Sequence, residues 1–109
     1  MKKIPLTPYP GEMLLTRCPK EFARAYRRLT GEAYRHEVST GGVSVKMIST
    51  THEDVELVYV EPKRNDYLAH EIGHVLLRLF KSIGSDPADG SGEPFCYMLS
   101  ELMRRAGKK

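Results

Sequence analysis

The longest helical pattern of the chain is residues 65–83, NDYLAHEIGHVLLRLFKSI. Its apolar side chains recur every three or four residues over about four turns, at Leu68, Ala69, Ile72, Val75, Leu76, Leu79, Phe80 and Ile83. This period is typical of an amphipathic helix that packs one face on a hydrophobic core. Asn65 or Asp66 can cap its start, and Gly84 ends it. The other elements must therefore pack around one long helix.

Three further patterns surround this helix. Pro19, Glu21 and a helical run of apolar residues predict an N-terminal helix that ends before Gly31. Residues 33–61 alternate and are rich in β-branched residues, which predicts a small antiparallel sheet of two or three strands. Residues 93–106 predict a C-terminal helix. The expected fold class is α+β, and 109 residues form a single domain, 1–109.

Two segments carry no regular pattern. Residues 1–16 contain three prolines and a glycine, and we expect an extended arm there. Residues 85–92, SDPADGSG, are polar and rich in turn formers, and we expect a mobile loop.

The charge and cysteine content exclude several classes of protein. The formal charge is +3, from 17 basic and 14 acidic residues, but Lys2, Lys3, Lys108 and Lys109 lie at the ends. We therefore do not expect nucleic acid as a partner; a run at Arg24, Arg27 and Arg28 is interpreted as a solvated helix face, with a partner patch left open. Two cysteines form no disulfide framework, and no apolar run reaches the roughly 20 residues of a membrane span. We expect a cytoplasmic protein without a membrane partner.

The long helix carries the motif H-E-x-x-H at His70, Glu71 and His74. A spacing of four places both imidazoles on one helix face, where they can share a Zn²⁺ ion. Glu71 flanks that face, and its carboxylate can take a proton from a water that the metal has activated. A chain with only four histidines rarely shows this spacing by chance. The alternative is two histidines that simply face solvent.

Two imidazoles alone make a weak site, so a third ligand is required. The candidates are Glu93, Cys96 and Glu101 downstream and His36 and His52 upstream. His-His-Glu ligation is typical of zinc but does not exclude manganese or cobalt.

The motif followed by 18 residues and Glu93 resembles the gluzincin metallopeptidases. The run Gly92-Glu93-Pro94-Phe95-Cys96-Tyr97 is similar to a stretch of their zinc aminopeptidase branch, and the order of elements resembles the small ImmA/IrrE peptidases. The resemblance implies a minimal zincin-like core in which Glu93 completes a His70, His74 and Glu93 zinc site.

The sequence thus predicts zinc-dependent hydrolysis of a protein or peptide substrate with Glu71 as the general base. The strand around residues 55–61 is expected to border the cleft and to pair with an extended peptide. The alternative hypothesis is a catalytically silent, metallopeptidase-like module that binds a protein partner and keeps zinc as a structural ion.

Overall fold

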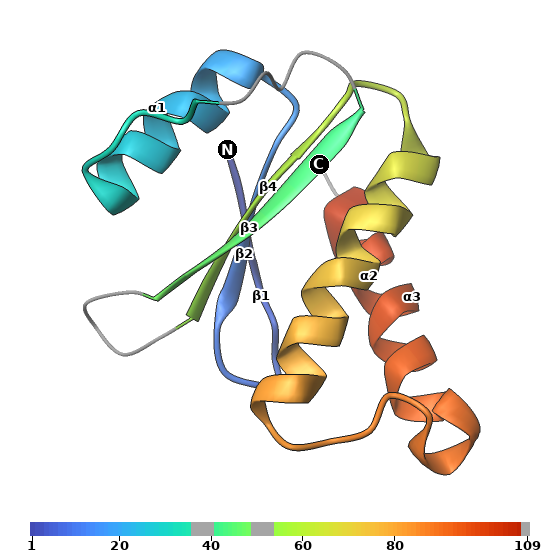
Figure 1. Cartoon of the computed structure of the whole chain (residues 1–109). Coiled ribbons are helices and arrows are strands. Elements are labelled where there is room, and N and C mark those ends of the chain that lie inside the picture. Colours follow the sequence, from blue (N-terminus) through green and yellow to red (C-terminus); the bar gives the residue numbers. More distant parts are fainter. Residues whose placement is uncertain (36–40, 49–53, 108–109) are drawn as a thin grey trace.

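The centre of the fold is a mixed four-stranded sheet. A computed structural model describes residues 1–35, 41–48 and 54–107 of the chain. The strands are β1 (Lys2–Pro5), β2 (Glu12–Thr16), β3 (Gly42–Ile48) and β4 (Asp54–Val60), in the order β1-β2-β4-β3 (Figure 1). β1 pairs with β2 and β3 pairs with β4 in antiparallel fashion, whereas β2 and β4 are parallel. The α+β class is confirmed, and β3 and β4 pair in antiparallel fashion as expected, but β1 and β2 add two unexpected strands and make the sheet mixed.

Helices cover both faces of this sheet, as Figure 1 shows. On one face lies α1 (Pro19–Thr30), whose Phe22 and Ala25 pack on Leu14, Val55, Leu57 and Tyr59. On the other face lie α2 (Asn65–Ser82) and α3 (Glu93–Gly107), which share a larger core with β1, β2 and β4. Val58 and Val60 alternate with Leu57 and Tyr59 along β4, because successive strand residues point to opposite faces. α2 and α1 therefore lie on opposite sides of the sheet.

The expected N-terminal arm is instead a β-hairpin. β1 and β2 occupy most of residues 1–16, and Ile4, Leu6 and Met13 are buried in the core beneath α2 and α3. Pro5 is the last residue of the edge strand β1, a position where the missing N–H is tolerated. Pro8 and Pro10 lie in the turn between the strands, and Ile4 of β1 pairs with Met13 of β2 in the hairpin.

The three helices agree closely with the sequence patterns. α2 begins at Asn65, but no side chain caps its N-terminus; Asp66 instead accepts hydrogen bonds of 2.9 and 2.7 Å from the Arg64 guanidinium. α2 and α3 are joined by residues 83–92, which contain the short turn η1 (Asp89–Gly92). In the part of the chain that the structure describes, no helix combines the length and apolarity of a membrane span.

Candidate metal centre

α2 holds His70 and His74 one turn apart on the side of the helix that faces away from the core. Both side chains are exposed, and their Nε2 atoms lie 3.1 Å apart. The ring planes are nearly perpendicular, at 83°, with centroids 4.7 Å apart. Two imidazole nitrogens that bind one tetrahedral Zn²⁺ at about 2.0–2.1 Å are separated by about 3.3 Å. The pair therefore has the spacing of two ligands of a single ion.

Glu71 projects toward the edge strand β3. Its side chain is buried, with 6% exposed, and lies against Gly42. A Cβ atom on Gly42 would lie 2.9 Å from Cγ of Glu71 and 3.1 Å from its Oε2. The backbone of Gly42 is not in the left-handed region, unlike that of Gly41 at φ 74°. Gly42 is therefore needed for the space it leaves to Glu71, and not for an unusual backbone conformation.

A partly buried ion pair connects α2 to the sheet two turns after Glu71. The guanidinium of Arg78 donates hydrogen bonds to both carboxylate oxygens of Glu56, at 2.6–3.1 Å, and to Oγ of Ser44 at 3.0 Å. Glu56 lies on β4 and is 3% exposed. Since Ser44 and Gly42 lie on the same face of β3, this pair sets the position of the strand against which Glu71 packs. Neither Arg78 nor Glu56 stood out in the sequence, because Glu56 interrupts the pattern of β4 as a single charge.

The structure does not bring Glu93 to the histidine pair. Phe80 of α2 and Phe95 of α3 are in contact, with ring centroids 5.6 Å apart, and α3 runs back along α2 (Figure 1). Glu93 lies before Phe95, so it is level with the last turn of α2. At 1.5 Å per residue, the last turn of α2 is about 12 Å from His74 along the axis of α2, and Glu93 is displaced from the histidine pair by about this distance. Glu93 is exposed and lines a shallow apolar hollow with Tyr9 and Tyr97.

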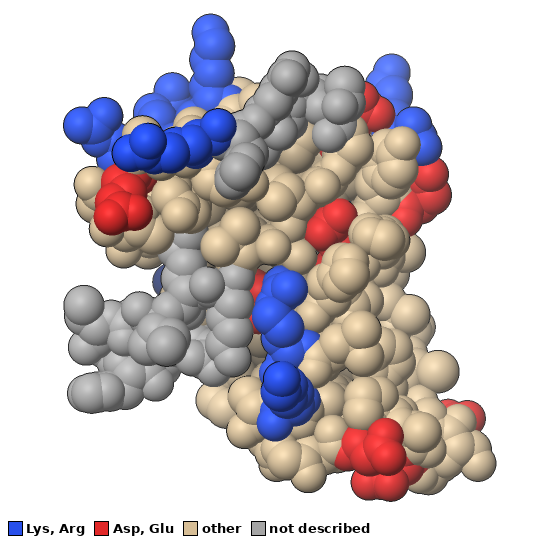
Figure 2. Space-filling model, viewed as in Figure 1, with Lys and Arg blue, Asp and Glu red and all other residues tan. Residues whose placement is uncertain are grey.

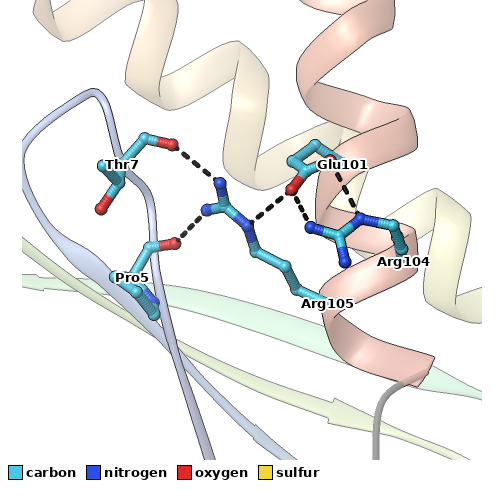
Figure 3. A network of polar contacts seen from close by, with 5 residues as sticks. All are labelled: Pro5, Thr7, Glu101, Arg104 and Arg105. Atoms are coloured by element: carbon cyan, nitrogen blue, oxygen red, sulfur yellow. Dashed lines mark hydrogen bonds and ion pairs between the residues drawn. The ribbon is translucent and has the colours of Figure 1, made fainter.

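Glu101 is engaged elsewhere on α3 (Figure 3). Its carboxylate accepts hydrogen bonds from Arg104 and, at 3.2 Å, from Arg105, and these bonds hold the pKa of Glu101 at about 2. Arg105 also donates to the carbonyl oxygens of Pro5 and Thr7, at 2.8 and 3.2 Å. Glu101 therefore helps to tie the last turns of α3 to the N-terminal hairpin and is not directed at the histidines.

Cys96, the last candidate ligand within the described residues, does not complete the site either. Cys96 is exposed on the first turn of α3. His36 and His52 lie outside the described residues. Across residues 1–35, 41–48 and 54–107, no three His, Cys, Asp or Glu side chains are grouped so that they could hold a metal ion. The described part of the site thus consists of two nitrogen donors and a neighbouring buried carboxylate.

Comparisons of the chain with protein-family models, with curated proteins and with solved structures found no match. The side chains of α2 and their contacts with β3 are therefore the observations from which a function can be inferred.

Proposed function

We propose that this protein is a zinc-dependent peptidase in which His70 and His74 bind the ion and Glu71 is the general base. The observation that carries the proposal is the 3.1 Å separation of the two Nε2 atoms on an exposed helix face, beside a buried carboxylate. The donor set fits zinc, which accepts imidazole nitrogen readily. Exposure of both rings keeps the site open to water and substrate, as a catalytic metal site requires.

In the proposed reaction, the two histidines and Glu71 have separate roles. Bound zinc would lower the pKa of a water molecule and polarise the carbonyl group of the substrate. His70 and His74 present two nitrogens from a rigid helix, so little conformational freedom is lost when they bind an ion. Glu71 follows His70 directly, and its packing against Gly42 restricts the positions that its carboxylate can take. From there Glu71 accepts the proton of the attacking water and can return it to the leaving amine.

Beside this site, an extended peptide could pair with an edge strand of the described sheet, but this is not the strand expected from the sequence. β4 lies between β2 and β3, so both of its edges are already hydrogen-bonded. β3 is at the edge of the sheet, and its residue Gly42 adjoins Glu71. We place the substrate along β3, where addition of a strand would supply main-chain hydrogen bonds near the general base.

That Glu93 is the third protein ligand of the zinc ion stays a prediction from the sequence. Glu93 can join His70 and His74 only if the start of α3 moves toward the middle of α2, because about 12 Å of helix separates the two levels. The proposal therefore rests on the histidine pair and Glu71, and Glu93 is tested separately.

The second candidate function is the protein-binding module with a structural zinc ion. One observation favours this module and argues against Glu93 as the third zinc ligand. The described residues bring together only two metal-binding side chains. A structural site has no use for Glu71 as a base, whereas a catalytic site does.

Glu71→Gln separates the two functions. We expect the purified wild-type protein with zinc to cleave an unstructured protein mixture, with new N-termini detected by mass spectrometry. Glu71→Gln should bind zinc as the wild type does and lose cleavage by about 100-fold or more, the usual scale of a lost general base. Cleavage that is unchanged in Glu71→Gln, or absent from the zinc-loaded wild type, would contradict the peptidase proposal.

A further inference from the structure

We propose that the exposed face of α1 binds the phosphate backbone of nucleic acid. Lys20, Arg24, Arg27 and Arg28 are all exposed on this helix. Figure 2 shows Lys and Arg side chains gathered over α1. This basic face, defined by these four residues, lies on the side of the sheet opposite α2 and the histidine pair. Its function is thus independent of the proposed peptidase.

The charges of the basic face are available to a ligand. Within the described part of the chain, none of its four side chains forms an ion pair or a side-chain hydrogen bond. The nearby acid, Glu21, is paired with the N-terminal ammonium group at 3.2 Å. A hydrogen bond from Thr16 is the main cause that lowers the pKa of Glu21, followed by the N-terminal ammonium group, and Arg24 of the basic face contributes least.

The N-terminal lysines, by contrast, both have polar partners. Lys2 donates a hydrogen bond of 3.2 Å to the carbonyl oxygen of Ala106, and Lys3 lies 3.5 Å from the carboxylate of Glu12. The sequence suggested that the positive charge belonged to loose ends. The structure instead gives the side chains of these two lysines partners on α3 and β2, whereas four cations without such partners in the described part of the chain lie together on α1.

The chemistry of the basic face favours nucleic acid over other anionic partners. Three of the four cations are arginine, whose planar fork binds phosphate oxygens in pairs. Lys20 and Arg28 are about 12 Å apart along the helix axis, which matches three to four nucleotides at about 3.4 Å each. Phe22 and Ala25 bury the apolar side of α1 against the sheet, so no apolar face remains to enter a membrane. The exposed large apolar side chain on α1 is Leu29 alone, and leucine is under-represented among the residues that anchor protein–protein interfaces.

The test compares two variants that lose the same charge. Arg24→Gln/Arg27→Gln/Arg28→Gln removes three cations from the basic face, and Lys3→Gln/Lys63→Gln/Lys81→Gln removes three from elsewhere on the surface. Binding of the full chain to a fluorescent DNA duplex of about 20 base pairs is followed by anisotropy between 50 and 200 mM salt. We expect wild-type binding in the micromolar range, with log affinity falling against log salt with a slope of about −3.

The arginine triple variant should bind at least tenfold more weakly, with a slope of about −1, while the lysine triple variant should stay within about threefold of the wild type. Circular dichroism of each variant checks the fold. Equal loss in the two variants would show a non-specific effect of net charge and overturn the proposal. Tighter binding to vesicles of anionic phospholipid than to DNA, lost in the arginine variant, would assign the basic face to membranes and likewise overturn it.

Discussion

The side chain of Glu71 fills the space that a side chain at Gly42 would occupy. A Cβ atom at position 42 would lie 2.9 Å from Cγ of Glu71, closer than real Cβ contacts come. It would also lie 3.2 Å from the carbonyl oxygen of Tyr59, a backbone atom that cannot move aside as the end of a side chain can. The general base of the proposed reaction is thus positioned by the absence of a side chain on an edge strand.

Gly42→Ala should therefore destabilise the protein by about 1–3 kcal/mol, the usual cost of overpacking. At a strand position with free space, alanine would instead add about 0.5–1 kcal/mol of stability. Urea unfolding of the wild type and Gly42→Ala measures the difference. In the background of Glu71→Asp, whose side chain is shorter, at least half of the cost should disappear.

Gly73 provides a matched control on the same helix. A Cβ atom there would meet nothing within 4 Å, and its backbone is helical. Gly73→Ala should stabilise α2 by about 0.5–1 kcal/mol. If Gly42→Ala behaves like Gly73→Ala, or costs the same with Asp at position 71, the contact between Gly42 and Glu71 does not have the role assigned to it.

The ion pair of Arg78 with Glu56 should contribute measurably to stability. Glu56→Ala leaves a partly buried guanidinium without its carboxylate, and we expect a loss of about 2–3 kcal/mol in unfolding free energy. This is less than for a fully buried pair, because the Arg78 side chain keeps 32% of its surface exposed. Replacing both residues, in Glu56→Leu/Arg78→Leu, should cost less than Glu56→Ala alone. A double variant that is as unstable as the sum of its single variants would contradict a coupled pair.

Glu101 should make stability depend on pH in the acidic range. Hydrogen bonds from Arg104 and then Arg105 lower its pKa from 4.5 to about 2 in the folded protein. The ionised form therefore favours folding, and this contribution is complete above about pH 4.5 and fades as the pH falls toward 2. Urea unfolding of the wild type and Glu101→Gln at pH 6 and pH 3 should show a difference that is smaller at pH 3. A difference that is constant or grows on acidification would be inconsistent with this role.

Glu93→Ala tests the third ligand directly. Because Glu93 is about 12 Å along the helix from the level of His74, we expect Glu93→Ala to retain zinc with an affinity within about threefold of the wild type. Zinc titration by calorimetry measures the affinity. A loss of tenfold or more would show that Glu93 acts on the ion, directly or through another ligand, and that α3 moves when zinc binds.

The helices were predictable from the sequence because their signals are local. Pro19, Gly84 and the apolar period of α2 each act within a few residues, and the observed bounds agree with them closely. The N-terminal hairpin was missed because the turn residues of 1–16 obscured the apolar residues of β1 and β2. Met13, Leu14 and Leu15 are buried on both faces of a central strand, which gives a continuous apolar run instead of alternation.

In the candidate site, too, the local features were predictable from the sequence and the long-range contacts were not. His70 and His74 are fixed by helix geometry, so a spacing of four is enough to bring them together. Glu93 depends on the length of α2 beyond His74 and on the path of residues 83–92, which no local pattern determines. Gly42 on β3 contacts Glu71 on α2 although the two residues are far apart in the sequence. The residues next to Gly42 predict only a turn at Gly41.

The measurement that tests the central claim most directly is the zinc content of the purified, dialysed protein. Elemental analysis should find close to one zinc ion per chain in the wild type and in the matched variant Leu77→Ala, which changes an exposed apolar residue of α2. Single variants His70→Ala and His74→Ala should each lose most of the zinc while their circular dichroism stays that of the wild type. A hydrogen bond between two neutral imidazoles would also give an N···N distance near 3 Å, so a folded wild type without zinc, or zinc retained in both histidine variants, would contradict the metal site.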